Sequence, residues 1–91
     1  MLTPKQRDER AMRILSVIEL SLDTTGDVPT VLQMSRQLGM AHSSLHEALV
    51  RMQRDGLIEW DKHAIKTLYV TDYGDLTYER AKRGKELGEL V

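Results

Sequence analysis

The chain has 91 residues, no cysteine and a formal net charge of −1. A chain of this length forms one domain with a modest core that oligomerisation often helps to stabilise, and the lack of cysteine excludes disulfides and thiolate metal sites. Neither a signal peptide nor a run of about 18–20 apolar residues is present. We therefore expect a cytoplasmic protein without a membrane partner.

The charges are spread along the chain without a strongly basic segment. Residues 1–13 carry a net charge of +2, residues 14–35 carry −3, and the remainder is nearly balanced. Tight nonspecific binding to nucleic acid needs a dense cationic surface. If the chain binds DNA, we expect a few basic side chains at specific positions to bind the phosphates, with their number doubled by dimerisation.

A first helix is predicted from Thr3 to about Leu22. Thr3 is typical of an N-cap, Pro4 suits the first helical position, and Gln6 completes a capping box. Apolar residues then recur at the spacing of one helix face. These residues are Ala11, Ile14, Leu15, Ile18 and Leu22.

Two short helices joined by a tight turn are predicted next, which is the helix-turn-helix signature. Thr30 is a natural N-cap for a helix that runs to about Leu38, and Gly39 lies where the chain must turn sharply. The Thr30 hydroxyl and the helix amides near it would also suit a DNA phosphate. A plain N-cap is the alternative for this hydroxyl.

The next helix is predicted to begin near Ala41 or Ser43 and to run to about Asp55. Its buried stripe is Leu45, Ala48, Leu49 and Met52, and its opposite face carries His42, Ser43, Ser44, His46, Glu47, Val50 and Arg51. In helix-turn-helix proteins the first residues of this helix reach the base edges, and serine and histidine bind both bases and phosphates. The alternatives are ordinary capping by the serines and a solvated face for the histidines.

A metal site formed by His42 and His46 is a weaker alternative. His63 is the only other histidine, and no HExxH pattern is present. We therefore expect neither a metal nor a cofactor.

A β-hairpin is predicted from Leu57–Trp60 and Ile65–Thr71, with both faces of the second strand at least partly covered. Its loop carries Lys62 and His63, and Lys66 follows. Beside a helix-turn-helix, such a hairpin forms a wing whose cations would hold phosphates or enter the minor groove. The alternative is a solvated tip whose charges serve solubility.

A last helix is predicted from Thr71, its N-cap, to about Leu87. Tyr73 and Leu76 begin a stripe at positions 73, 76, 80, 83, 87 and 90 that is interrupted by arginine at 80 and 83. We expect this helix to leave the domain and to pack on a partner subunit; the alternative is a frayed, charged tail. The predicted organisation is a winged helix-turn-helix domain at 1–71 and a dimerisation helix at 72–91.

The predicted order of elements is mainly α with a small β-hairpin, and it resembles the winged helix-turn-helix of transcriptional regulators: a three-helix core, a wing and a C-terminal helix. Residues 38–59, LGMAHSSLHEALVRMQRDGLIE, resemble the recognition block of GntR-type regulators. LTPKQ at 2–6, with Gly26, Pro29–Thr30 and Leu38–Gly39, is similar to the DNA-binding domain of LexA. Residues 69–74, YVTDYG, resemble the step into the dimerisation helix of MarR-like and PadR-like regulators.

The GntR-like block implies base or phosphate contacts from positions 42, 43, 44 and 46. His42 and His46 stand where that family usually has arginine, which suggests DNA binding that strengthens as the histidines protonate below about pH 6.5. The chain shows no counterpart of the self-cleaving domain of LexA-like proteins or of the effector domain of GntR-like proteins. The resemblance therefore implies a stand-alone regulator of a bacterium, plasmid or phage.

We expect a sequence-specific binder of double-stranded DNA, a homodimeric transcriptional repressor that reads the major groove. The alternatives are a winged-helix module for protein–protein interaction, favoured by the near-neutral charge, and a replication or partition factor. The sequence contains no enzyme motif and gives no indication of a small-molecule pocket. We therefore expect that the protein is not an enzyme. The expected DNA-binding residues are Thr30, Arg36, His42, Ser43, Ser44, His46, Arg51, Lys62, His63 and Lys66.

Overall fold

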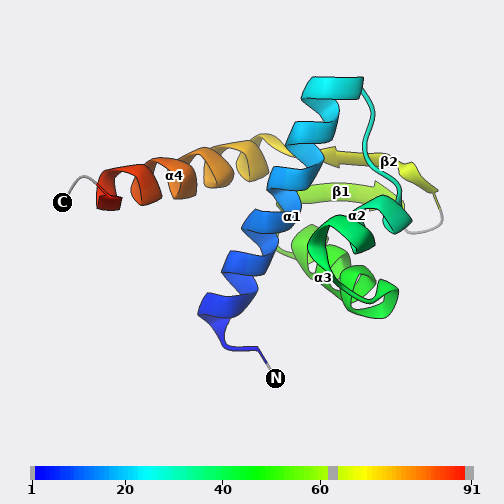
Figure 1. The fold of residues 1–91 in the computed structure, drawn as a ribbon, viewed down its shortest axis with the longest axis horizontal. Helices are drawn as coiled ribbons and strands as arrows, with labels where there is room; N and C mark the ends of the chain where they lie inside the picture. The colour runs from blue at the N-terminus through cyan, green and yellow to red at the C-terminus, as the bar shows by residue number, and fades with distance from the viewer. Residues whose placement is uncertain (1, 62–63, 90–91) are drawn as a thin grey trace.

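The computed structural model describes residues 2–61 and 64–89. Its elements are α1 (Pro4–Thr25), α2 (Val31–Leu38), α3 (His42–Arg54), β1 (Ile58–Asp61), β2 (Ala64–Val70) and α4 (Asp72–Glu89). Three helices pack together beside an antiparallel hairpin, and α4 extends away from them (Figure 1). The predicted fold class, a winged helix-turn-helix with a C-terminal helix, is confirmed.

The capping box predicted for α1 is confirmed. The Thr3 hydroxyl accepts a hydrogen bond from the Gln6 amide at 3.1 Å, and the Gln6 side chain accepts one from the Thr3 amide at 2.9 Å. The helix runs past the predicted end at Leu22 to Thr25. The hydroxyls of Thr24 and Thr25 bond back to main-chain carbonyls one turn earlier, so these turn-forming residues prolong the helix instead of ending it.

The turn between α2 and α3 depends on Gly39. This residue adopts φ 65° and ψ 34°, the left-handed region that glycine enters without steric cost, and its amide bonds to the Ser35 carbonyl. The Met40 amide also bonds to that carbonyl at 3.0 Å. The chain thus reverses within a few residues and starts α3 at a fixed angle to α2.

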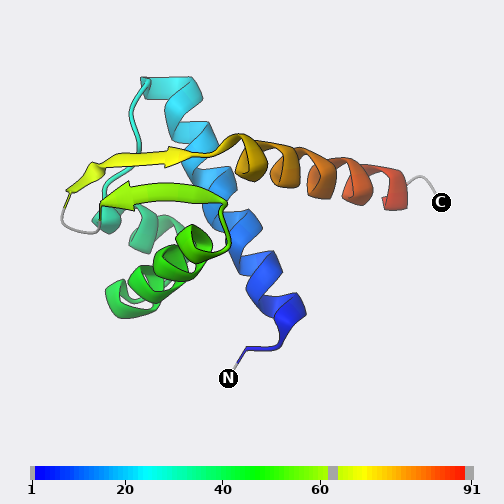
Figure 2. The ribbon, with the colours of Figure 1, turned by 180° about the vertical axis from the view of Figure 1, so that it is seen from behind.

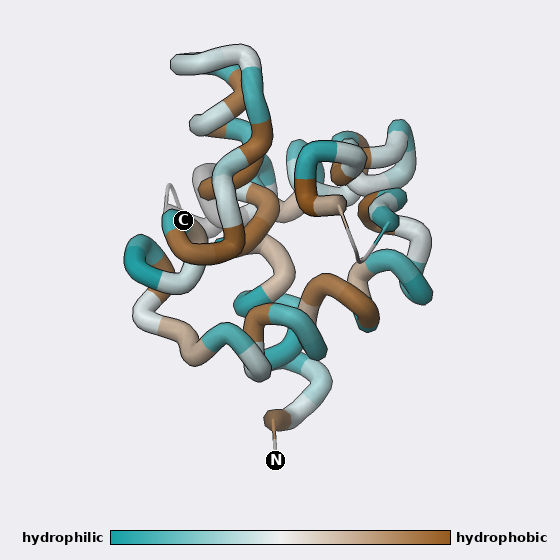
Figure 3. The backbone as a smooth tube through the Cα atoms, turned by 90° about the vertical axis from the view of Figure 1, so that its right-hand side faces the viewer, coloured by the Kyte–Doolittle hydropathy of each residue, from teal (hydrophilic) through white to brown (hydrophobic). Residues whose placement is uncertain are grey.

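One hydrophobic core joins α1, α2, α3 and the hairpin. The stripes predicted for the first helix and for the helix after Gly39 face it, as expected for amphipathic helices that bury one face, and α2 adds Met34 and Leu38. Figure 3 shows hydrophobic and hydrophilic stretches alternating along the chain. The buried residues are Ile14, Leu15, Ile18, Met34, Leu38, Leu45, Ala48, Leu49, Met52, Leu57, Ile58, Trp60 and Leu68.

The hairpin pairs Ile58 with Val70 and Glu59 with Tyr69, and its strands lie within one residue of the predicted bounds. We predicted that both faces of the second strand are at least partly covered, and this is wrong for the face that carries Thr67 and Tyr69. Ile65 is half-buried, but Thr67 is exposed and Tyr69 is 57 % exposed. The helices cover only one face of this two-stranded sheet, and the other face meets solvent.

The start of α4 is fastened to the start of β1. The Thr71 hydroxyl accepts a hydrogen bond from the Gly74 amide at 2.9 Å, as its predicted N-cap role requires. It donates to the Gly56 carbonyl at 2.5 Å and lies 3.1 Å from the Leu57 carbonyl. A Cβ atom at Gly74 would overlap that carbonyl. The direction in which α4 leaves the domain is therefore set by a backbone contact that only glycine permits.

The helix α4 meets the domain near its start and projects away from it toward the C-terminus (Figures 1 and 2). Tyr78 packs against the core cluster, whereas Tyr73 and Leu76 are 59 % and 50 % exposed. Among the described helices, none is long and apolar enough to cross a membrane.

Candidate nucleic-acid interface

The side of α3 that faces away from the core is a continuous exposed stripe, which we call the α3 outer face. Because Leu45, Ala48, Leu49 and Met52 are buried, the helix has one fixed rotation. The outer face follows the helical repeat of three and four residues. It consists of His42, Ser43, His46, Glu47, Val50, Arg51 and Arg54, which are all exposed.

The first turn of α3 presents polar side chains that the fold does not use for capping. Ala41 is the N-cap and makes no side-chain hydrogen bond, so the capping alternative for Ser43 and Ser44 is wrong. Within the described chain neither serine hydroxyl has a hydrogen-bond partner. Ser43 is exposed beside His42, whereas Ser44 is half-buried and therefore less accessible.

The imidazole of His46 leans on the hairpin. Its ring meets the Trp60 indole edge-on, with 5.4 Å between the ring centroids and an interplanar angle of 70°, a favoured aromatic geometry. Trp60 is only 7 % exposed. This contact orients His46 and ties α3 to the hairpin, although His46 remains exposed to solvent like His42.

The structure adds no further ligand to a metal site at His42 and His46 among the described residues. Across residues 2–61 and 64–89, no group of three or more histidine, cysteine, aspartate or glutamate side chains is arranged to hold a metal ion.

The remaining predicted phosphate ligands lie on exposed surfaces. The Thr30 hydroxyl accepts a hydrogen bond from the Gln33 amide at 3.1 Å as part of a second capping box, which leaves its own hydrogen available to donate. Arg36 is exposed in the last turn of α2, and Lys66 is exposed on β2. Lys62 and His63, the loop residues of the predicted wing, lie outside the described residues.

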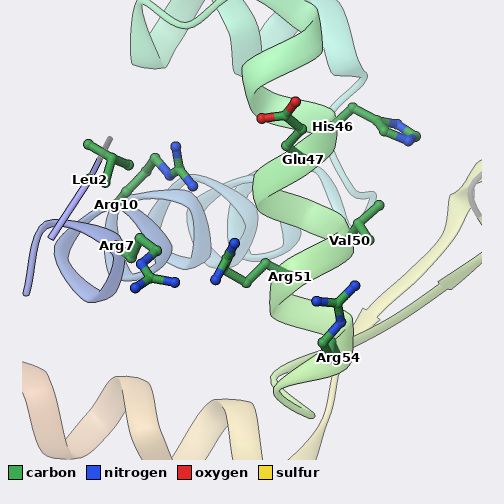
Figure 4. A pocket seen from close by; sticks show the side chains of 8 residues that line it. All are labelled: Leu2, Arg7, Arg10, His46, Glu47, Val50, Arg51 and Arg54. Carbon is green, nitrogen blue, oxygen red and sulfur yellow. The ribbon is translucent and has the colours of Figure 1, made fainter. Parts of the chain in front are cut away.

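Sequence reasoning missed a hollow between α1 and α3 that collects four arginines. Arg51 extends from α3 toward α1, where Arg7 and Arg10 lie on the facing helix (Figure 4). The hollow has a volume of about 700 Å³, and we call it the arginine hollow. Its lining residues are Leu2, Arg7, Arg10, His46, Glu47, Val50, Arg51 and Arg54.

The sequence contains a signal for this hollow. Arg7 and Arg10 are three residues apart on one helix, and Arg51 and Arg54 are three apart on another, so each pair shares a helix face. The signal is incomplete because the packing of α1 against α3 decides whether the two faces meet. Of the predicted site residues, His46 and Arg51 line the hollow with Arg7, Arg10 and Arg54.

Acidic side chains gather at the other end of α1. Burial, a hydrogen bond to Asp75 and the negative charges of Asp75, Asp23 and Glu79 raise the pKa of the Glu19 carboxyl from 4.5 to about 7. Glu19 lies about 18 Å along the helix axis from Arg7, beyond the screening length of about 8–10 Å at physiological salt. The near-neutral net charge thus conceals a basic region and an acidic region that act separately.

A comparison with protein families and curated proteins adds one match. A family model described as the LexA DNA binding domain matches residues 1–67, from the start of α1 into β2. A search of curated proteins found no match to the chain.

Proposed function

Because the chain belongs to the LexA DNA binding domain family, we propose that it is a transcriptional regulator, acting as a repressor, that reads its operator with the α3 outer face. Binding to double-stranded DNA is the function of this family's domain. The observation that carries the proposal is the exposed, unused polar first turn of α3. We propose that the protein binds DNA and does not catalyse a reaction. It would act in the bacterial cytoplasm, on the DNA of a bacterium, a phage or a plasmid.

The α3 outer face changes in character along its length in the way that groove binding requires. His42 and Ser43 in the first turn offer donors and acceptors to base edges, as the start of a recognition helix does. Val50 in the middle is 36 % exposed and suits contact with a thymine methyl group. Arg51 and Arg54 at the far end suit phosphates.

The hairpin would serve as the wing in this arrangement. The contact of Trp60 with His46 holds the hairpin at a fixed position beside α3. Lys66 on β2 is exposed, and with Lys62 and His63 it would contact phosphates or the minor groove. Thr30 and Arg36 would hold phosphates from α2.

We further infer that two copies assemble through α4. The support is the stripe formed by Tyr73 and Leu76, because at least half of the surface of each side chain is exposed. These residues lie on a helix that projects from the core (Figure 2). Paired domains would read a pseudo-palindrome with half-sites about one helical turn apart. A dimer also doubles the number of cations that meet the duplex.

Selection of bound fragments from random duplex DNA, followed by sequencing, tests the proposal. We expect an enriched motif with two related halves. On that motif, Ser43→Ala combined with His46→Ala should lower the preference over random duplex by roughly 5- to 100-fold, since a well-placed base contact is worth about 1–3 kcal/mol. Lys66→Ala is the matched variant and should weaken both duplexes alike.

Three outcomes would overturn the proposal in whole or in part. If neither variant alters binding, α3 is not the reader. If the wild-type chain binds no duplex even at low salt, a winged-helix module for protein–protein interaction becomes the better account. An enriched motif that lies in a replication or partition site instead of a promoter would move the function to those processes.

A further inference from the structure

We propose that the arginine hollow is a binding site for backbone phosphates of the duplex, so that α1 contacts DNA beside the groove that α3 enters. This inference rests on the proposed function and deepens it by adding a second contact element. It assigns a role to Arg7 and Arg10, and it places Arg51 and Arg54, already proposed as phosphate ligands, where the two surfaces meet.

The charge in the hollow is concentrated and only partly compensated. Four guanidinium groups line it, against the single carboxylate of Glu47. Within the part of the chain that the structure describes, none of the four arginines forms an ion pair with a carboxylate. Four positive charges that share one nearby carboxylate favour the arrival of an anion, because an anion relieves their mutual repulsion.

Arg7 has one side-chain donor that the fold leaves without a partner. Its side chain is half-buried, and its Nε atom is buried without a hydrogen-bond partner among the described residues. A buried donor without a partner costs free energy that a bound acceptor recovers. Arginine also presents parallel N–H groups that fit two oxygens of one phosphate, which makes phosphate the matching chemistry.

The position of the hollow points to the DNA backbone. His46, Glu47, Val50, Arg51 and Arg54 belong both to the α3 outer face and to the hollow, so the two surfaces are continuous. From Ser43 to Arg51 the helix rises about 12 Å, which is close to the width of the major groove, about 12 Å. With the first turn at the base edges, the hollow therefore reaches the phosphate row that borders the groove.

The test compares two variants that remove the same charge from the same helix. Arg7→Gln with Arg10→Gln empties one wall of the hollow. Lys5→Gln with Arg13→Gln is the matched control, since both side chains are exposed on α1 and line a different groove, toward α4. Binding to the selected motif and to a random duplex is measured from 50 to 300 mM salt by fluorescence anisotropy.

We expect the Arg7→Gln, Arg10→Gln variant to bind both duplexes at least tenfold more weakly at 100 mM salt. The slope of log affinity against log salt should become shallower by about 1.8, since each phosphate contact contributes about 0.9 to it. The control should keep the wild-type slope. If the hollow variant fails to fold, as judged by circular dichroism, Arg10→Gln alone replaces it with an expected slope change of about 0.9.

Failure of this inference is distinguishable from failure of the proposed function. A wild-type chain that binds DNA, with a hollow variant that keeps its slope, overturns the inference alone; a wild-type chain that binds no duplex overturns both. Titration with inorganic phosphate and pyrophosphate, followed through the arginine Nε–H resonances, distinguishes a free anion from the backbone. Tight saturation by these anions, with DNA binding unaffected in the hollow variant, assigns the hollow to a small anion and also overturns the inference.

Discussion

At the scale of single residues, Thr30 has a structural role and an expected functional one. Its hydroxyl oxygen accepts a hydrogen bond from the Gln33 amide, and the Gln33 side chain accepts one from the Thr30 amide at 2.9 Å. This capping box alone explains a threonine at the start of α2. The hydroxyl hydrogen remains for a phosphate oxygen, so a substitution that keeps the cap and changes only the charge separates the two roles.

Thr30→Asp is that substitution. Aspartate caps a helix at least as well as threonine and suits the positive end of the helix dipole, so the free energy of unfolding should stay within about 0.5 kcal/mol of wild type. A carboxylate repels phosphate, and DNA affinity should fall about tenfold, or ~1.4 kcal/mol. Urea unfolding and DNA titration measure the two effects. Thr30→Ser should retain both properties, and undiminished DNA binding by Thr30→Asp would reduce Thr30 to a cap.

At the scale of secondary-structure elements, α4 has two dissimilar sides. Tyr78 packs on the core, and Gly74 brings the first turn against the Leu57 carbonyl. These contacts orient the helix, and they turn Tyr73 and Leu76 into solvent. An exposed tyrosine and leucine at helical spacing form the side that a second copy would cover.

Leu76→Glu should disrupt such a dimer. Placing a carboxylate in an apolar interface removes favourable burial and adds the cost of desolvating a charge, so dimerisation should weaken by more than tenfold. Sedimentation equilibrium measures the association constant. Leu20→Glu is the matched control, because Leu20 is 62 % exposed on α1 and lies outside this stripe. Equal association of wild type and Leu76→Glu would remove α4 from the proposed interface.

At the scale of the whole molecule, charge is sorted by tertiary structure. The helix α1 carries two arginines of the hollow, Arg7 and Arg10, in its first half, and Glu19 and Asp23 in its second half. Glu19 there meets Asp75 and Glu79 of α4, and its carboxyl has a pKa of about 7, raised by burial and by these neighbours. A net charge of −1 therefore says little about the field that a DNA duplex meets at the arginine hollow.

The raised pKa of Glu19 makes stability depend on pH. Between pH 4.5 and 7 the folded chain binds a proton at Glu19 that the unfolded chain has released, so folding is favoured as the pH falls through 7 toward 4.5. The urea midpoint of wild type should rise from pH 8 to pH 5.5. Glu19→Gln should flatten this rise and exceed wild-type stability at pH 8, whereas Glu9→Gln, elsewhere on α1, should not. Parallel pH profiles for wild type and Glu19→Gln would contradict the assignment.

The sequence by itself determined the features that arise from short-range interactions. Capping at Thr3, Thr30 and Thr71, the turn at Gly39 and the apolar stripes of α1 and α3 depend on neighbours within about one helical turn. These predictions were confirmed. With their order along the chain they were sufficient for the winged helix-turn-helix fold. The extension of α1 to Thr25 was missed because threonine hydroxyls either break or prolong a helix, depending on which carbonyl they find.

The tertiary structure alone decided the features that need two distant segments in contact. The arginine hollow joins residues 7 and 10 to residues 51 and 54, the wing is held by Trp60 against His46, and Tyr69 is exposed because the helices cover only one face of the hairpin. Local periodicity gives each helix its polar and apolar sides. It does not give the angle at which two helices cross, and that angle determines which polar sides share a surface.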